Sequence, residues 1–136
     1  MPETTVAAII HPEEGDERIL LTKRGRLGTF PGYWCIPGGH IEAEEPFRDA
    51  VVREVLEETG LDYEAVFFRP FDEIFPENGI HFVALVFSGV GRGRLRNQES
   101  EVVESAWVPL EEARAMTLAF THNQVLDAYA RRDASA

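Results

Sequence analysis

Two spacings of hydrophobic residues divide the chain into expected strands and helices. Residues 4–10 and 18–23 are runs of β-branched and aliphatic residues, separated by a polar stretch that contains Pro12 and Gly15. Short apolar runs bounded by such residues predict two strands joined by a turn. Residues 24–32 hold three glycines and a proline and predict a loop.

The next short strand leads into a glycine turn. We expect it over residues 33–36, followed by a tight turn at Pro37-Gly38-Gly39. Further along, residues 63–71 and 80–87 are aromatic and β-branched, which predicts two more strands. The segment between them ends in Asn78-Gly79, a strong hairpin signal.

Helical spacing appears in three places. Pro46 and Gly60 bound the first helix, because proline suits the first helical position and glycine the residue past the end. Its hydrophobic stripe, which should face the core, consists of Phe47, Val51, Val52, Val55 and Leu56. Residues 109–113 predict a helix begun by proline, and residues 121–131 carry Val125, Leu126 and Tyr129 at helical spacing.

These elements predict a single α/β domain over residues 1–136. One more strand is expected over residues 102–108, after a turn at Gly89-Val90-Gly91. Strands before, between and after helices indicate a mixed sheet packed between helical layers. An exposed edge of such a sheet is compatible with a homodimer.

Composition narrows the class of protein. Hydrophobic residues make up 44% of the chain and charged residues 27%, a balance typical of a globular protein. The net charge of −11 disfavours a stable nucleic acid partner, because an acidic surface repels the phosphate backbone. No apolar run is long enough for a membrane span, Cys35 is the only cysteine, and the N-terminus lacks a signal-peptide pattern. We therefore expect a cytoplasmic protein.

The candidate chemistry lies in residues 39–61, GHIEAEEPFRDAVVREVLEETGL. Glu54, Glu57 and Glu58 are three and four residues apart, which places their carboxylates on one helical face. Like charges at this spacing destabilise a helix by roughly 0.2–0.5 kcal/mol per pair, unless a cation neutralises them. An all-oxygen cluster without histidine or cysteine favours Mg²⁺ or Mn²⁺. A solvated acidic face is the alternative for such a charge run.

The same run resembles a family motif. Gly39, five residues, Glu45, seven residues and then Arg53-Glu54-Val55-Leu56-Glu57-Glu58-Thr59-Gly60-Leu61 match the Nudix box at every fixed position. Residues 20–24, Trp34 and residues 107–110 extend the resemblance to the Nudix hydrolase family over nearly the whole chain. It implies an α/β/α sandwich with the box as a loop-helix-loop at one end of the sheet.

The resemblance also implies an activity, the hydrolysis of a nucleoside diphosphate linked to another group. Glu54, Glu57 and Glu58 would then be metal ligands, with Glu45 and the backbone of Gly38 and Gly39 completing the site. Glu54, or a carboxylate outside the box, would accept the proton from water. Arg53 resembles the box arginine that holds a glutamate in place, and an ordinary four-residue pair with Glu57 is the alternative.

Two further acidic positions follow from the family pattern. A late glutamate often joins the metal site, and we favour Glu101 over Glu99 and Glu104 for this role. Glu44 is a departure, because many members carry glycine before the box glutamate. The turn there can bend differently or gain a carboxylate, and we expect no loss of activity.

Substrate recognition has to come from outside the box. The aromatic residues Phe30, Tyr33 and Phe75 lie in or beside loops and can stack a base, although covering the edge of the core is the alternative. The candidates for phosphate contacts are Arg24 and Arg26. Trp34 is expected in the core, and Arg92, Arg94 and Arg96 are expected in solvent.

The favoured substrate is a nucleoside triphosphate, cleaved to nucleoside monophosphate and pyrophosphate. This preference rests on His81-Phe82-Val83, which resembles sequences of triphosphate-cleaving Nudix proteins. ADP-ribose or a nucleotide sugar is the nearest enzymatic alternative. A sensor that binds a nucleotide without cleaving it is an alternative of another class, disfavoured by the intact box. Decapping of RNA is disfavoured by the acidic surface.

Overall fold

The sheet at the centre of the fold mixes parallel and antiparallel pairs. The computed structural model describes residues 1–96 and 102–132 of the chain. Strand β1 (Glu3–His11) runs parallel to β7 (Ile80–Arg92), and β4 (Gly38–His40) pairs antiparallel with the other edge of β1. On the far side of β7 lie β6 (Val66–Phe75) and the two-residue β5 (Asp62–Tyr63). A mixed sheet was predicted, and the structure confirms it.

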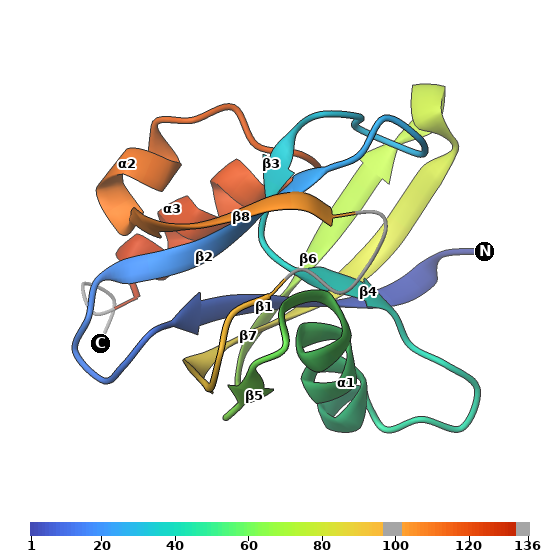
Figure 1. The fold of residues 1–136 in the computed structure, drawn as a ribbon. Coiled ribbons are helices and arrows are strands. Elements are labelled where there is room, and N and C mark those ends of the chain that lie inside the picture. The colour runs from blue at the N-terminus through green and yellow to red at the C-terminus, as the bar shows by residue number, and fades with distance from the viewer. Residues whose placement is uncertain (97–101, 133–136) are drawn as a thin grey trace.

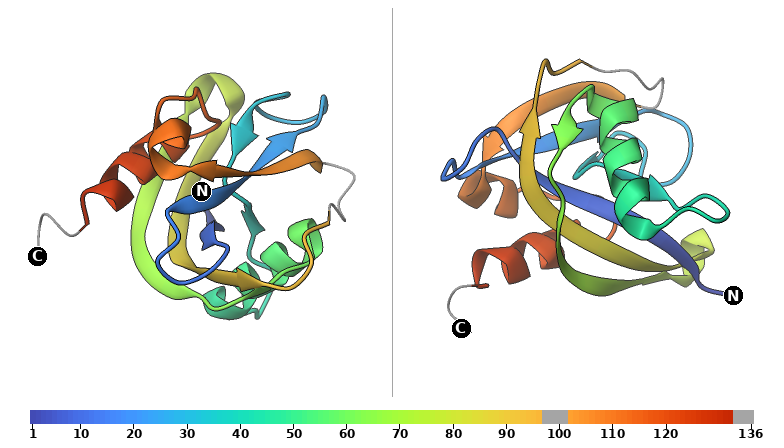
Figure 2. Two further views of the ribbon diagram at one scale, coloured as in Figure 1. Left: turned by 60° about the vertical axis from the view of Figure 1, so that its left-hand side comes forward. Right: turned by 90° about the horizontal axis from the view of Figure 1, so that it is seen from below.

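A second, three-stranded sheet crosses above the first (Figure 1). Its central strand is β2 (Arg18–Arg24), which pairs antiparallel with β3 (Trp34–Cys35) and β8 (Val102–Pro109). The three helices are α1 (Phe47–Thr59), α2 (Leu110–Arg114) and α3 (His122–Ala130). Figure 2 shows α1 on one side of the molecule, away from α2 and α3.

Alternating side chains of β1 fill two cores. Ala7 and Ile9 belong to the core cluster beneath α2 and α3, whereas Val6, Ala8 and Ile10 belong to the cluster beneath α1. A strand that is buried on both faces needs apolar residues at every position, because successive side chains point to opposite faces. This explains the unbroken apolar run near the N-terminus and places helices on both faces of the sheet.

The box helix is bounded as its sequence predicts. Pro46 is the residue before the first turn of α1, and Gly60 ends the helix in the left-handed conformation with φ of 79°. The buried stripe is narrower than predicted, consisting of Ala50, Val51, Val55 and Thr59. Phe47 and Leu56 stay 46% and 45% exposed. Their prediction as core residues was wrong, since helical spacing alone does not tell how much of a face the sheet covers.

Two predicted glycine turns are strands in the structure. Gly38 and Gly39 lie in β4, and residues 89–91 lie within β7. A Cβ on Gly38 would overlap the carbonyl oxygen of Val6, and one on Gly91 would lie 2.6 Å from Ile10 Cγ2. These glycines therefore allow close packing, which the sequence alone cannot distinguish from a turn. The predicted hairpin at Asn78-Gly79 is confirmed, with a short 3₁₀ turn, η1 (Pro76–Asn78), before Gly79.

Within the described residues, no helix has the length and apolar character needed to cross a membrane.

Candidate active site

The C-terminal half of α1 faces β4 across a very short gap. A Cβ built on Gly39 would lie 2.5 Å from both carboxylate oxygens of Glu54, so a larger residue here would displace this carboxylate. The next turn of the helix is held in the same way, because the Gly38 N–H donates to Glu58 Oε2 at 3.1 Å. The two glycines thus bring the main chain of β4 against two of the predicted metal ligands.

Arg53 ties the acidic residues of the box together. Its Nε and Nη2 donate to the two carboxylate oxygens of Glu45 at 2.7 and 3.0 Å. Its Nη1 donates to Glu54 Oε1 at 3.0 Å and to Glu57 Oε2 at 3.1 Å. Nη2 also donates to the carbonyl oxygen of His40 at 3.1 Å. Both predicted contacts of Arg53 are therefore present, the pair with Glu57 and the contact with other box glutamates.

This network shifts the protonation of its members in opposite directions. Hydrogen bonds from Arg53 lower the pKa of Glu45 to about 2, and the same bonds raise the pKa of Arg53. Burial raises the pKa of Glu54, against the opposing effect of Arg53. Glu45 and Arg53 therefore form a permanently charged pair, whereas burial of Glu54 opposes its ionisation.

The donor set fits a hard divalent cation. Glu54, Glu57 and Glu58 offer only oxygen atoms on one face of α1, beside main chain that approaches without a side chain. Within the described residues, no three His, Cys, Asp or Glu side chains already converge on one point. Glu57 accepts a hydrogen bond from Arg53 through Oε2, which leaves Oε1 as the oxygen that could bind a metal. The resemblance to the Nudix family implies a divalent metal ion at such a site.

Two adjoining cavities meet at these residues. The first, of about 350 Å³, is lined by the acidic residues of α1 together with Lys23, Arg53 and Val102. The second, of about 330 Å³, extends from Glu58 towards the N-terminus of α3. Both are lined by Arg24, Cys35, Gly38, Gly39, His40 and Glu58. We name the first the acidic cavity and the second the aromatic cavity.

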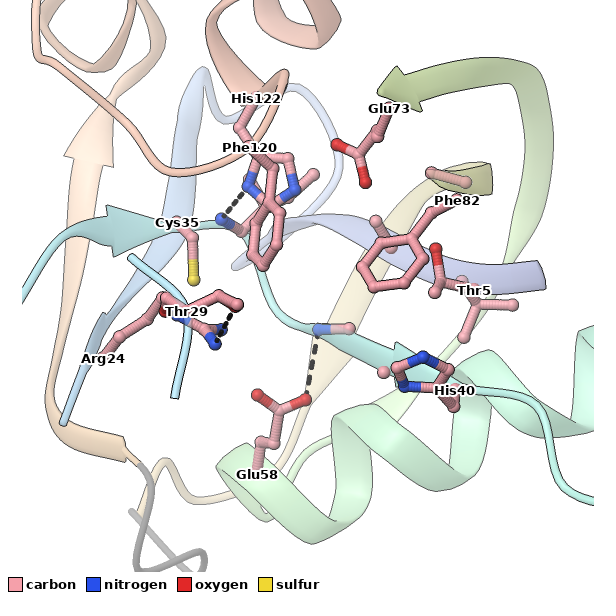
Figure 3. Close-up of a pocket in the computed structure, with 16 residues that line it drawn as sticks. Thr5, Arg24, Thr29, Cys35, His40, Glu58, Glu73, Phe82, Phe120 and His122 are labelled. Carbon is pink, nitrogen blue, oxygen red and sulfur yellow. Dashed lines mark hydrogen bonds between the residues drawn. The ribbon is translucent and has the colours of Figure 1, made fainter. Parts of the chain in front are cut away.

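The aromatic cavity is built from segments that are distant in the sequence. Figure 3 shows Phe120 and Phe82 pointing into it from different sides, with Glu73 and His122 at its inner end. The Phe82 and Phe120 ring centres are 6.3 Å apart. The guanidinium carbon of Arg24 lies 4.9 Å from the centre of the Phe120 ring, in a cation–π contact.

Of the five predicted substrate residues, Arg24 alone lines the acidic and aromatic cavities. Its guanidinium donates to Thr29, through Nε to the carbonyl oxygen at 2.8 Å and through Nη2 to the hydroxyl at 3.4 Å. Arg26 is exposed. Phe30, Tyr33 and Phe75 form an aromatic cluster, in which Phe30 contacts both other rings at 5.6 and 5.3 Å. Phe30 also contacts Phe120 at 4.8 Å, so this cluster lies behind the cavity wall.

The sequence prediction missed Phe120, Phe82, Glu73 and His122. Phe120 lies between Ala119 and Thr121 in a loop with no motif, and it takes a φ of 53°, which a bulky residue rarely adopts. Glu73 lies near the end of β6 next to Asp72, and the sequence has no signal that tells this buried acid from its exposed neighbour.

The structure locates most of the other residues that the sequence analysis singled out. Glu99 and Glu101 lie outside the described residues, so the role of Glu101 stays a prediction. Glu104 is exposed in β8, opposite Lys23. Glu44 has a φ of 63°, so it takes the left-handed conformation that favours the glycine of other members. Trp34 packs against the core, as predicted, and Arg92 pairs with exposed Glu64 at the surface.

Comparison with known proteins decides the family. The model of the NUDIX domain matches residues 1–129. The chain belongs to the Nudix family. A MutT Nudix hydrolase from Burkholderia pseudomallei has the same fold, with a TM-score of 0.84 and 32% identity over 93% of this chain and 97% of that one. The Nudix fold and the resemblance that predicted it are thus confirmed.

Two relatives indicate the range of the family. An ADPR-responsive transcriptional repressor, NtrR of Acinetobacter baylyi, is 30% identical over 94% of this chain and 53% of its own length. The m7GpppN-mRNA hydrolase NUDT17 of Danio rerio is 47% identical over 51 residues, which are 37% of this chain and 17% of that protein. The chain thus spans about half or less of the length of these relatives.

Proposed function

We propose that the chain hydrolyses the pyrophosphate linkage of a nucleoside triphosphate, releasing nucleoside monophosphate and pyrophosphate in a Mg²⁺-dependent reaction. The observation that supports it is the junction of the two cavities, where Glu58 and the glycines of β4 line both. A nucleotide has a charged and an aromatic part, and this junction offers one cavity to each. A cytoplasmic location stays a prediction from the sequence.

The box residues divide the work at the acidic end. Glu54, Glu57 and Glu58 would hold Mg²⁺, with the backbone of Gly39 beside them, and Glu101 is proposed as a further ligand. The bound ion would neutralise phosphate charge and lower the pKa of a bound water. Glu54 is proposed as the proton acceptor, because its half-buried carboxylate stands against the main chain of β4. Arg53 keeps Glu45, Glu54 and Glu57 in place through its hydrogen bonds.

Arg24 is the candidate for contacting phosphate from the opposite wall. It lines both cavities, and its guanidinium donates to the carbonyl oxygen and the hydroxyl of Thr29. An arginine fork suits bidentate contacts with phosphate oxygens. Arg26, Phe30, Tyr33 and Phe75 do not line these two cavities, so their contact with a substrate stays a prediction.

A second candidate function is the binding of ADP-ribose. The relative that covers nearly the whole chain is a repressor described as ADPR responsive. ADP-ribose also carries a base and a diphosphate, so it suits the same two cavities. A pyrophosphatase would cleave the bound ADP-ribose, whereas a sensor would bind it without cleavage. A nucleotide sugar also has a base and a diphosphate, so the same two alternatives apply to it.

A product assay distinguishes these functions. The purified protein is incubated with Mg²⁺ and, separately, with nucleoside triphosphates, ADP-ribose, nucleotide sugars and a capped RNA fragment. Pyrophosphate released from a triphosphate supports the proposal. AMP and ribose phosphate from ADP-ribose select the second candidate, and binding of ADP-ribose without any product selects the sensor. Gel filtration of the same sample tests the homodimer that the exposed sheet edge allows.

A further inference from the structure

The inner end of the aromatic cavity holds a buried carboxylate. Glu73 is 3% exposed, and its Oε2 accepts hydrogen bonds from the backbone N–H of Thr121 at 3.0 Å and from its hydroxyl at 2.7 Å. The other oxygen, Oε1, has no hydrogen-bond partner among the described residues, and Figure 3 shows the carboxylate turned into the cavity. No buried side-chain oxygen of the described residues lacks a partner, so Oε1 is accessible from the cavity, and a donor on a bound molecule can reach it.

A hydrogen-bond donor stands beside it. His122 is 5% exposed, and its Nδ1 accepts the backbone N–H of Ile36 at 3.1 Å. Burial, with the nearby charge of Arg24, lowers the pKa of His122 to about 3, so the ring is neutral at physiological pH. With Nδ1 acting as an acceptor, the single ring proton has to be on Nε2. In Figure 3 this second nitrogen lies on the side of Glu73 and the cavity.

Flat apolar surfaces flank this donor and acceptor. Phe120 is held in left-handed backbone, which turns its ring into the cavity, and Phe82 extends from β7. Rings in this arrangement stack the face of a base, and the polar groups between them meet its edge. Stacking alone tolerates any base, so selectivity has to come from Glu73 and His122.

We propose that Glu73 and His122 select nucleotides whose base carries an exocyclic amino group. This inference rests on the proposed function, in that it takes the aromatic cavity as the site of the base. The Glu73 carboxylate would accept the amino hydrogen, and His122 Nε2–H would donate to the ring nitrogen next to that group. Adenine and cytosine offer this pair at one edge, and guanine offers it through its 2-amino group and N3.

Bases with an oxo group in that place are disfavoured. Uracil and hypoxanthine present a carbonyl oxygen where cytosine and adenine present the amino group, and an N–H in place of the ring acceptor. The carbonyl oxygen would face a carboxylate and the N–H would face another donor, which leaves both protein groups unsatisfied. Discrimination by a matched donor and acceptor pair corresponds to roughly tenfold or more in specificity.

Glu73 also has a structural role, since Thr121 precedes the first residue of α3. Glu73→Gln separates the two roles. The glutamine oxygen can still accept from Thr121, whereas its NH₂ group takes the place of Oε1 and changes an acceptor into a donor. A purely structural role predicts equal effects on every nucleotide, whereas base recognition predicts that the preference moves towards the oxo bases.

The experiment compares two pairs that differ only in this group, CTP with UTP and ATP with ITP. We expect kcat/KM of the wild type to favour the amino member of each pair by about tenfold or more. In Glu73→Gln this ratio should fall by a similar factor and UTP and ITP should gain, whereas Glu77→Gln, a control on exposed η1, should leave it unchanged. A wild type without preference, or an equal loss for all four nucleotides in Glu73→Gln, overturns the inference.

Dissociation constants for the same pairs, measured by calorimetry, separate this inference from the proposed function. Absence of turnover for every compound overturns the proposed hydrolysis. In that case the dissociation constants decide base selection, since binding does not require cleavage. The wild type should bind CTP more tightly than UTP and ATP more tightly than ITP, and Glu73→Gln should lose this preference.

Discussion

The two ends of the site differ in charge and in the origin of their residues. At the acidic end, one helix supplies Glu54, Glu57 and Glu58, and β4 meets it through two glycines. At the aromatic end, the residues come from β6, β7 and the loop before α3, and they meet only in the folded chain. Chemistry on a diphosphate depends on carboxylates held rigidly by one element, whereas base recognition depends on how separate elements pack. Substitutions at the two ends should therefore have different kinetic signatures.

The largest effect is expected from Glu58→Gln at the acidic end. Loss of one charged ligand should lower Mg²⁺-dependent kcat by on the order of a thousandfold, because metal stabilisation of the transition state amounts to several kcal/mol. The rate of product formation and the thermal unfolding of the variant are both measured. Glu77→Gln, the same substitution at an exposed position, is the control. A folded Glu58→Gln protein that keeps most of its activity would show that this carboxylate holds no metal.

The two glycines of β4 should respond differently to alanine. In Gly39→Ala the Cβ displaces the Glu54 carboxylate, a flexible group, so we expect a folded protein with kcat/KM reduced on the order of a hundredfold. In Gly38→Ala the Cβ meets the main chain of β1, which cannot move aside, so we expect unfolding to become easier by roughly 1–3 kcal/mol. Denaturant titration beside activity assays tests the pair. Equal stability of both variants would contradict the explanation.

At the aromatic end, Phe120→Leu should raise KM and leave kcat nearly unchanged. Base–aromatic stacking contributes about 1–3 kcal/mol, which corresponds to roughly a tenfold rise or more in KM. Phe75→Leu is the matched control, because Phe75 was predicted from the sequence as a stacking residue but lies behind the cavity wall. If Phe75→Leu has the larger effect on KM, the base lies elsewhere.

His122 should make the stability of the protein depend on pH. Its pKa is lowered from 6.5 to about 3 in the folded state, so only the unfolded chain takes up a proton between these values. The contribution is fully present above pH 6.5 and is lost as the pH falls towards 3, by about 2 kcal/mol between pH 7 and pH 5. His122→Asn can still accept the Ile36 N–H but does not titrate. As the pH is lowered, the free energy of unfolding of His122→Asn should decrease less than that of the wild type. Identical pH dependence of the two proteins would exclude His122 as the cause of the wild-type loss.

The smallest effect concerns the turn before α1. Glu44 adopts a φ of 63°, which costs a residue with a Cβ about 1–2 kcal/mol, partly offset in glycine by its greater freedom when unfolded. Glu44→Gly should therefore stabilise the protein by roughly 1 kcal/mol or less, with activity unchanged. Denaturant unfolding measures this gain, and a loss of stability would contradict the strain at this position.

Sequence prediction reached the acidic end because its residues share one helix. The spacing of Glu54, Glu57 and Glu58 fixes their common face, and Pro46 and Gly60 fix where the helix begins and ends. The predicted strands were also found, since apolar runs with flanking turn residues encode them locally. The division into two sheets was not predictable, because pairing of β2 with β8 joins residues that are 78 to 91 positions apart.

The aromatic end could not be predicted for the same physical reason. Phe120 and Phe82 approach each other only after β7 and α3 are in place. Phe82 was noted only as part of His81-Phe82-Val83, and no motif surrounds Phe120. The predicted aromatic residues Phe30, Tyr33 and Phe75 form a cluster in which Phe30 makes edge contacts with the other two rings. They do not line the aromatic cavity. Loop position is thus a weaker guide to a binding residue than a contiguous motif is.

The most direct test of the account is one set of kinetic measurements on four proteins: the wild type, Glu58→Gln, Phe120→Leu and the double variant. The preferred nucleotide and Mg²⁺ are varied, and kcat and KM are determined for each. If one nucleotide spans both ends, Glu58→Gln lowers kcat, Phe120→Leu raises KM, and the two effects on kcat/KM multiply in the double variant. A wild type that releases no product from any nucleotide, or a Phe120→Leu protein with unchanged KM, would contradict it.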